Sequence, residues 1–441
     1  MNRQHRPTRT LWKWLTPGIG VKRWLGVLLL GVTVLGLGLG LVILQFFRSY
    51  PIPPLEFIIT LGGLPLWARA LIAGVVGGAL VVWAARNIGQ AIFTPLDVRT
   101  GEVVDAMVEY RQRGRGPKIV AIGGGTGLPT LLRGLTAYTS NITAIVTVAD
   151  DGGSSGRLRR DLGVLPPGDF RNNIAALARD ESLMTQLFQY RFGEGGLEGH
   201  SFGNLFITAL SGVTGNFEQA LIESSRVLAI RGQVLPSTLQ DVTLMADLRE
   251  EITNSTRRVA GESAIPEGGG AIERVFLVPD TAPAYPEAVR AILSADLIVV
   301  GPGSLFTSIL PNLLISGIQD AVRHSRALKV YVCNVASQRG ETEGFSVGDH
   351  VRAIERHVGP GLFDVVLAND RFPDIREEVN FSYVPIAENN SATGQPGVTI
   401  VTAPLVDELR PWRHDSVRLA EALASLLAEP NEATRSLHKL R

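Results

Sequence analysis

Between residues 117 and 430 the chain alternates short apolar runs with stretches of helical periodicity, and this alternation limits the possible folds more than any other feature of the sequence. Runs such as Ile142–Ala149 and Leu297–Val300 are mostly apolar, as strands are when both faces of a sheet are covered. The segments between them, such as Leu128–Tyr138, place apolar residues at helical spacing. The pattern predicts an α/β fold: a doubly wound, largely parallel Rossmann-like sheet with helices on both faces.

The same reading places the other elements of this domain. The remaining strands that we expect are Lys118–Ile122, Val242–Ala246, Arg274–Val278, Val330–Val335, Val365–Leu367 and Val398–Thr402. The remaining helices are Phe170–Asp180, Gly203–Ser211, Phe217–Ala229, Tyr285–Leu293, His350–His357 and Val417–Leu427. Ligands of such folds bind beyond the carboxyl ends of the strands, so the loops there are the candidate site. Residues 431–441 form a C-terminal tail.

Two long apolar segments precede this domain. Residues 24–47 contain no charged residue, and a helix of roughly 24 residues is long enough to cross a bilayer. Residues 66–85 contain only Arg69, and tryptophans lie at or near the ends of both segments, as interfacial anchors do. A cleaved signal peptide and a pair of buried core helices are the alternatives. We expect a transmembrane helical hairpin.

The charges beside these segments predict its orientation. Residues 1–23 contain six Lys and Arg and no acidic residue, whereas the loop between the segments has only Arg48 and Glu56. The positive-inside rule then places both termini and the main domain in the cytoplasm. Residues 86–116 form a juxtamembrane linker, which either contacts anionic lipid headgroups or is simply solvated.

The overall composition excludes several classes of protein. The 42 Lys and Arg balance the 42 Asp and Glu, so the chain lacks the basic excess typical of nucleic-acid-binding domains, and we expect no nucleic acid partner. Cys333 is the only cysteine, which excludes an intramolecular disulfide framework and cysteine-rich metal sites.

The strongest local motif joins an apolar strand to a helix through glycines. Residues 118–127 read KIVAIGGGTG, so that Gly123, Gly124, Gly125, Thr126 and Gly127 come between the strand and the helix. Such a loop brings backbone N–H groups and a helix N-terminus close to an anion. It matches neither the dinucleotide fingerprint nor a Walker loop. We expect a phosphate-binding loop; glycines used only for packing are the alternative.

A second polar motif follows the next strand. Asp150 and Asp151 are adjacent, so on extended backbone their side chains point to opposite faces. One could hold Mg²⁺ or a ribose hydroxyl while the other caps the loop, and an Asx-capped turn is the alternative. Ser154 and Ser155 are typical of a phosphate-binding nest.

Two further polar clusters open predicted helices. Asp169 is the expected N-cap of one helix, and Arg171 and Asn172 then lie in its first turn, where a cation is unfavourable unless an anion meets it. His200 and Asn204 open the next helix, and His200 is equally compatible with a structural role. We include all of them except the cap among the candidate ligand-binding residues.

A second glycine-containing loop follows the strand Leu297–Val300. It contributes Gly301, Gly303, Ser304 and Thr307 and leads into another helix. Two such loops on one sheet suggest a diphosphate or a bulky phosphorylated ligand at the switch point. Asn334, at the end of a third strand, is expected at the same rim.

Six motifs in this order resemble one known family. GGGTG, DDGGSSG, PPGD-x-RN, GH-x-x-GN, ADLIVVGPGSLFTSILPNLL and CNVASQRGET are similar to the gluconeogenesis factor (YvcK) family of the CofD-like superfamily, over roughly Lys118–Leu427. The resemblance implies a protein that binds UDP-sugars such as UDP-N-acetylglucosamine and affects bacterial cell shape. The CofD branch of the superfamily comprises 2-phospho-L-lactate transferases that use Mg²⁺ and a deazaflavin substrate.

The resemblance also implies roles for two residues near the C-terminus. Arg413 would contact the nucleotide sugar, and Ser416 stands where the YvcK branch can carry a Ser/Thr phosphorylation site. Two features depart from the family pattern: the membrane hairpin is absent from its common soluble form, and Ala336-Ser337 replaces the more usual Met-Thr.

We therefore expect a membrane-anchored, YvcK-type regulatory protein that links central carbon metabolism to envelope synthesis. Its expected partners are a UDP-sugar, membrane lipid, a Ser/Thr kinase and a second copy of itself in a dimer. The cofactor to be considered is Mg²⁺, with Asp150 and Asp151 as its ligands. The alternatives are a CofD-type transferase and a membrane scaffold with a vestigial site. No catalytic residue is assigned, and the expectation leans away from an enzyme.

Overall fold

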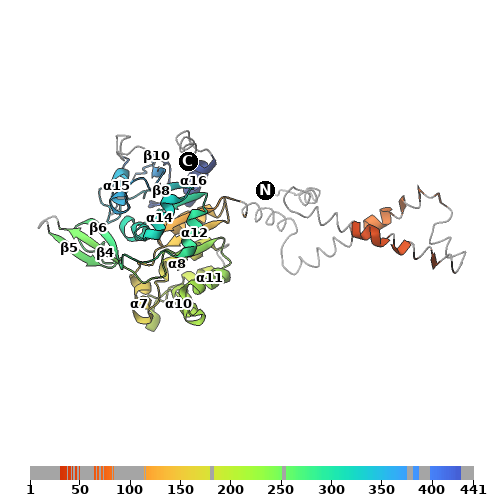
Figure 1. The fold of residues 1–441 in the computed structure, drawn as a ribbon, viewed down its shortest axis with the longest axis horizontal. Helices are drawn as coiled ribbons and strands as arrows, with labels where there is room; N and C mark the ends of the chain where they lie inside the picture. The colour runs from red at the N-terminus through yellow and green to blue at the C-terminus, as the bar shows by residue number, and fades with distance from the viewer. Residues whose placement is uncertain are drawn as a thin grey trace. The chain divides into compact units, whose positions relative to one another are not determined.

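The structure is a computed structural model of the chain. It describes residues 30–36, 38–40, 42, 45–46, 49, 64–65, 67–68, 71–72, 74–81, 83, 114, 116–178, 183–250, 255–374, 381–386 and 398–428. The chain divides into two compact units, Met1–Gln112 and Arg113–Arg441 (Figure 1).

In the first unit the described residues of segments 30–49 and 71–83 are helical, and they expose large apolar side chains such as Leu35 and Val75. Within the described part of the chain, no single helix is both long and apolar enough to cross a membrane. Much of 24–47 and 66–85, and nearly all of the linker 86–116, lies outside the described residues. The transmembrane hairpin therefore stays a prediction.

The second unit is built on a seven-stranded sheet in which each pair of neighbouring strands is parallel. The strand order is β10-β9-β8-β7-β1-β2-β3. The strands are β1 (Ile119–Gly123), β2 (Ile142–Val146), β3 (Gln233–Pro236), β7 (Leu297–Val300), β8 (Leu328–Val332), β9 (Val365–Asn369) and β10 (Thr399–Ala403). The predicted α/β fold with a largely parallel sheet is confirmed.

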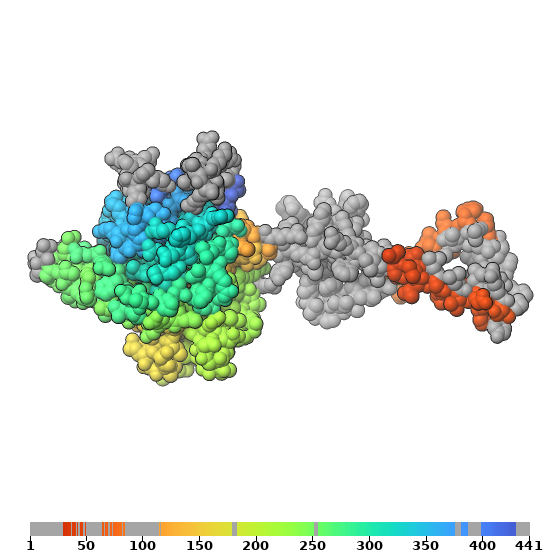
Figure 2. All heavy atoms as spheres, in the orientation of Figure 1, coloured from red at the N-terminus to blue at the C-terminus, as the bar shows by residue number. Residues whose placement is uncertain are grey.

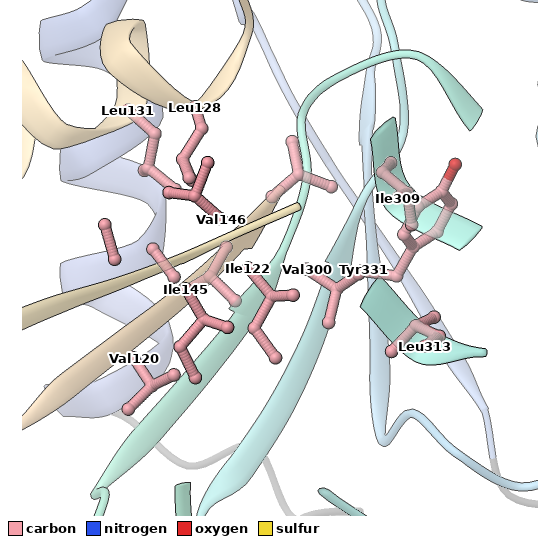
Figure 3. Packing of buried hydrophobic residues seen from close by; sticks show 14 of the residues in the cluster. Val120, Ile122, Leu128, Leu131, Ile145, Val146, Val300, Ile309, Leu313 and Tyr331 are labelled. Carbon is pink, nitrogen blue, oxygen red and sulfur yellow. The ribbon is translucent and has the colours of Figure 1, made fainter. Parts of the chain in front are cut away.

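Helices pack on this sheet and on one another. They are α6 (Leu128–Leu135), α7 (Gly153–Leu162), α8 (Gly168–Leu177), α9 (Leu183–Gln189), α10 (Phe202–Thr214), α11 (Phe217–Val227), α12 (Pro286–Leu293), α13 (Leu310–Leu313), α14 (Ser316–His324), α15 (Val347–Val358) and α16 (Ser416–Ala428). Every residue of β1, β2, β7 and β9 is buried, which is why these strands are almost continuously apolar. Figure 3 shows Leu128 and Leu131 of α6 directed toward the strands.

A separate antiparallel sheet extends from the side of this unit (Figures 1 and 2). Its order is β5-β4-β6, with β4 at Thr243–Arg249, β5 at Thr256–Ala260 and β6 at Ala271–Val278. The expectation that Val242–Ala246 and Arg274–Val278 belong to the parallel sheet is wrong, although both segments are strands. Along β4 buried residues alternate with partly exposed ones, as in a sheet with one covered face.

Several further details differ from the sequence prediction, since α7, α9, α13, α14 and β5 were not expected. Helix α7 begins at Gly153, so Ser154 and Ser155 lie in its first turn and not in an open nest. Helix α8 begins at Gly168, with Pro167 at the N-cap position, so Asp169 is inside the helix and does not cap it. The short edge strand β3 was not expected, because four residues that end in proline give little strand signal.

Candidate functional site

The strand order reverses between β1 and β7, which lie side by side and parallel. β1 continues into the loop 124–127 and then α6, and β7 continues into the loop 301–304 and a π-helical turn, Leu305–Ile309. Ligands of doubly wound sheets bind at such a switch point. The two glycine-rich motifs therefore meet at the place where the fold favours a ligand.

The first glycine loop fits tightly against its surroundings. A β-carbon at Gly125 would collide with the Asp169 carboxylate, and one at Gly127 would collide with the carbonyl oxygen of Pro302. One at Gly124 would lie 2.6 Å from Ser308 Oγ. None of these glycines has a positive φ, so close packing and not backbone conformation requires them. Packing thus explains much of the motif, and Gly127 directly joins the two loops.

The second loop is braced by a buried glutamate, Glu341. Its carboxylate accepts hydrogen bonds from the hydroxyls of Ser304 at 2.6 Å and Thr307 at 3.1 Å, and from the N–H of Phe306 at 3.2 Å. Burial raises the pKa of Glu341. Ser304 and Thr307 line the site as predicted, but in this structure their hydroxyls hold Glu341.

Two other residues fix the same loop. The Asn334 side chain accepts from the N–H of Gly303 at 3.1 Å and donates to its carbonyl oxygen at 2.8 Å. Gly301 has a φ of +85°, and a β-carbon there would lie 2.8 Å from the Val332 carbonyl. Asn334 therefore positions the loop through Gly303, and Gly301 packs against the end of β8.

A cleft of about 620 Å³ opens between the two loops, a volume within the range of small-molecule sites. Its walls come from segments that are distant in sequence. The lining residues are Thr126, Gly127, Thr130, Glu262, Ser263, Pro266, Pro302, Gly303, Ser304, Thr307, Ser308, Asn334, Val335, Ala336, Ser337, Gln338, Arg339, Glu341, Phe381, Trp412, Arg413 and His414.

A hairpin near the C-terminus forms one rim of this cleft. It consists of β11 (Val406–Asp407) and β12 (Arg410–His414), and it carries Arg413 and Trp412. The rings of Trp412 and Phe381 lie 6.1 Å apart in an edge-to-face arrangement. The rim thus offers a guanidinium and an exposed indole to a ligand.

Three carboxyl groups near the cleft interact with one another, and of these Glu262 lines the cleft. Burial, followed by the charge of Asp150, raises the pKa of Glu262 to about 7. Burial, with the charges of Asp150 and Glu262, raises the pKa of Asp169 well above its usual range. Burial also raises the pKa of Asp150. Carboxyl groups whose pKa is raised by burial and by neighbouring charge are typical of functional sites.

The adjacent aspartates have different partners, as their opposite directions predicted. Asp150 accepts a hydrogen bond from the N–H of Gly152 at 2.9 Å and so caps the loop. Asp151 accepts from the N–H and the hydroxyl of Ser263, at 2.9 and 2.8 Å. Asp151 therefore ties the loop after β2 to the segment after β5, which brings Glu262 to the cleft.

The fit of this region to Mg²⁺ can be judged from its donors. The described residues contain no group of three or more His, Cys, Asp or Glu side chains arranged to hold a metal ion. Asp150, Asp169 and Glu262 nevertheless repel one another, and a cation would relieve that repulsion. Mg²⁺ is commonly held by one or two carboxylates together with substrate phosphates and water. Asp150 suits that mode because its charge acts on both Asp169 and Glu262, whereas the Asp151 carboxylate holds both the N–H and the hydroxyl of Ser263.

Other predicted residues lie outside the lining of this cleft, in two separate hydrogen-bonded groups. The Ser154 hydroxyl is 2.9 Å from His200 Nδ1 and accepts a hydrogen bond from the Asn204 amide at 3.1 Å. Arg171 is buried, and its guanidinium donates to the side chain of Asn172 at 2.8 Å. Burial and the charge of Arg157 lower the pKa of His200.

The family model for 2-phospho-L-lactate transferase CofD matches residues 119–406. The gluconeogenesis factor of Bacillus subtilis is 46% identical over 323 residues, which cover 72% of this chain and 100% of that protein. The chain belongs to the gluconeogenesis factor (YvcK/UPF0052) family. A crystal structure of a UPF0052 family member from Bacillus halodurans has a TM-score of 0.65 at 42% identity and covers 70% of this chain and 99% of that one.

The family also includes longer relatives. A protein from Nostoc sp. that carries the gluconeogenesis factor name is 47% identical over 428 residues, covering 93% of this chain and 91% of its own length. A match to 93% of the chain must extend into residues 1–112. The N-terminal segment is therefore shared with some members of the family, while the Bacillus subtilis member matches 72% of this chain.

The structure thus divides the predicted site residues into two groups. Thr126, Gly127, Gly303, Ser304, Thr307, Asn334 and Arg413 line the switch-point cleft. Gly123, Gly124, Gly125, Asp150, Asp151, Ser154, Ser155, Arg171, Asn172, His200, Asn204 and Gly301 are not part of its lining. Glu262, Ser263 and Phe381 line the cleft and were not predicted, because no local motif distinguishes them.

Proposed function

We propose that the switch-point cleft binds a UDP-sugar such as UDP-N-acetylglucosamine, and that the bound ligand is a regulatory signal connecting carbon metabolism with envelope synthesis and cell shape. The observation that carries the proposal is the convergence of two strand-end loops, Arg413 and an exposed aromatic rim around one cleft. The guanidinium suits a diphosphate, and Trp412 offers a face on which a base can stack.

Titration calorimetry with the purified protein tests this proposal. UDP-N-acetylglucosamine should bind, whereas free N-acetylglucosamine should bind far more weakly, because it lacks the diphosphate that the cleft recognises. UMP separates the contribution of the base from that of the diphosphate. Equal binding of the free sugar and the nucleotide sugar would contradict the proposal.

One observation favours a second function, a CofD-type transferase. Glu262 has a pKa of about 7 and lines the cleft, which suits a general base. The donor would be a lactyl nucleoside diphosphate. The acceptor hydroxyl would attack the phosphorus that carries the lactyl group, and the bond from that phosphorus to the nucleoside monophosphate would break. The nucleoside monophosphate would leave, and Glu262 would take the proton of the hydroxyl. When bound, Mg²⁺ would neutralise phosphate charge. We prefer the regulatory function because Arg413 and Trp412 belong to the segment that resembles the YvcK branch.

We further propose that the first unit anchors the protein in a membrane, with both termini in the cytoplasm. The support is the apolar sequence of 24–47 and 66–85 together with the exposure of the apolar helical residues described there. Binding to a Ser/Thr kinase at Ser416, which is the first residue of α16, and dimer formation also stay predictions.

A further inference from the structure

The loop after β7 and the π-helical turn that follows it bind a carboxylate of the chain itself, that of Glu341. Ser304 Oγ lies 2.6 Å from both carboxylate oxygens. The carboxylate also accepts hydrogen bonds from the Thr307 hydroxyl at 3.1 Å, the Phe306 N–H at 3.2 Å and the Gln338 amide at 3.0 Å. Hydroxyls and N–H groups at a strand end are the donors that a phosphate would use. In this loop they serve a carboxylate instead.

These contacts determine what the loop can offer to a ligand. A hydroxyl has one hydrogen to donate, and the hydroxyls of Ser304 and Thr307 donate theirs to Glu341, so a ligand meets the lone pairs of their oxygens. Both residues line the switch-point cleft. A ligand group that reaches them has to donate hydrogen bonds, as a sugar hydroxyl or an amide N–H does and as an ionised phosphate or carboxylate does not.

Glu262 adds a second carboxyl group to the same part of the lining. Burial has the largest effect on its pKa, which rises to about 7; the charges of Asp150, Asp151 and Glu341 raise it further, and a hydrogen bond with the Thr307 side chain lowers it. Thr307 therefore interacts with two carboxyl groups, Glu262 and Glu341. Ionised carboxyl groups accept hydrogen bonds and repel other anions.

The charges of the cleft are distributed unevenly between exposed and buried residues. Among the described residues of the lining, the two arginines, Arg339 and Arg413, are exposed. The two glutamates are more deeply placed: Glu262 is half-buried, and Glu341 is only 6% exposed. His414 is buried, and burial lowers its pKa to about 4, so it adds no charge near neutral pH. The cleft is thus positive at its exposed rim and negative at its buried wall.

This distribution orients a nucleotide sugar. Trp412 and Arg413 are adjacent on β12, so a base stacked on the indole and a diphosphate held by the guanidinium both lie at the hairpin. The ribose joins those two groups and stays with them. The remaining part of the ligand, its sugar, then faces the wall formed by Ser304, Thr307 and the two glutamates.

We propose that Glu262 and Glu341 determine which nucleotide sugars the cleft accepts: a neutral sugar that donates hydrogen bonds is bound, and a sugar that carries a negative charge is rejected. Glu262 accepts hydrogen bonds from the sugar, and Glu341 acts through the orientation of the Ser304 and Thr307 hydroxyls and through its charge. The inference rests on the proposed function and specifies the ligand class of that same site.

Titration calorimetry with UDP-glucose and UDP-glucuronate tests the proposal. The two probes differ only at C6 of the sugar, which is a hydroxymethyl group in one and a carboxylate in the other. At a pH above the pKa of Glu262, the full chain should bind UDP-glucose at least about tenfold more tightly than UDP-glucuronate. Equal binding of the two would overturn this proposal and leave the proposed function standing. Binding of neither these probes nor UDP-N-acetylglucosamine would overturn both.

Two variants assign the preference to the two glutamates. Glu262→Gln and Glu341→Gln should each reduce the preference for UDP-glucose by about three- to tenfold, mainly because UDP-glucuronate binds more tightly. The matched control is Glu194→Gln, an exposed glutamate outside the cleft lining, which should leave the preference unchanged. Glu341 holds the loop, so its variant is to be checked by thermal unfolding. Glu262→Gln decides the matter if that variant does not fold: an unchanged preference in Glu262→Gln would overturn the proposal.

Discussion

Gly127 packs directly on the carbonyl oxygen of Pro302, so the glycine loop after β1 and the loop after β7 touch with no room for a side chain between them. The contact joins the two strand ends on either side of the switch point. It fixes the width of the cleft that both loops line.

Gly127→Ala should therefore damage the site. The methyl group forces the two loops apart, and we expect UDP-N-acetylglucosamine to bind about tenfold more weakly or worse, as measured by calorimetry. Gly212→Ala is the matched control, because that exposed position in α10 has no atom within 4 Å of an added β-carbon. The control should bind normally and gain about 0.5–1 kcal/mol in free energy of unfolding. Normal binding by the Gly127 variant would show that the contact between the loops does not control the affinity for UDP-N-acetylglucosamine.

Arg413→Ala should lower the affinity for UDP-N-acetylglucosamine by roughly 10- to 150-fold, the range of about 1.5–3 kcal/mol for a hydrogen bond to a charged group. Arg410→Ala is its control, since Arg410 lies on the same strand but pairs with Asp407. Equal affinity of the Arg413 variant and the unmodified protein would remove Arg413 from the site.

Glu262 should make stability depend on pH. Its pKa is about 7 in the folded protein against a usual value of 4.5, so between these values the folded state holds a proton that the unfolded state has released. The free energy of unfolding therefore falls as pH rises through this range. Glu262→Gln removes this loss and should be more stable than the unmodified chain by about 1–3 kcal/mol above pH 7, with little difference at low pH.

Urea unfolding at about pH 5 and about pH 8 measures this difference. Nucleotide binding should follow the same group, since an ionised Glu262 repels a diphosphate: affinity should fall as pH rises through about 7, and Glu262→Gln should flatten the profile. If unfolding and nucleotide binding of Glu262→Gln depend on pH in the same way as those of the unmodified chain, Glu262 does not have the role given to it here.

The proposed membrane hairpin predicts a defined topology. A reporter fused at either end of the chain should be active only in the cytoplasm, and one inserted at Pro53 should behave as external. Salt washes should leave the protein in the membrane fraction, and detergent should release it. Complete release by high salt without detergent would show that residues 24–47 and 66–85 do not span the bilayer.

Much of the fold could be predicted from the sequence because burial on both faces leaves a plain local signal. β1, β2, β7 and β9 are fully buried and almost continuously apolar, and the helix beginning at Leu128 has regular spacing. Membership of a sheet is not local information. β4 and β6 are strands, as predicted, but β4 pairs with β5 and with β6 in the separate antiparallel sheet, and nothing in Val242–Ala246 indicates these partners.

The site was predictable only in part, for a similar reason. A glycine-rich loop at a strand end marks the switch point, and Arg413 was placed there by its resemblance to the family. The sequence could not show that the hydroxyls of Ser304 and Thr307 would donate hydrogen bonds to Glu341. Nor could it show that Asp151 would bind Ser263, which lies 112 residues further along the chain. These pairings arise only when distant segments meet in the folded chain.

The central claim is that the cleft binds a nucleotide sugar without transforming it, and Asp151→Asn tests it most directly. Asp151 holds Ser263, which lines the cleft, so its loss should distort one wall of the cleft and weaken UDP-N-acetylglucosamine binding. The unmodified protein, incubated with Mg²⁺ and either UDP-N-acetylglucosamine or a lactyl nucleotide plus a deazaflavin acceptor, should return its substrates unchanged by mass spectrometry. Catalytic accumulation of a transferred product would contradict the account. If Asp151→Asn abolished that product but retained ligand binding, the protein would be a transferase. The reason is that a change that removes only stabilisation of the transition state lowers kcat and not affinity.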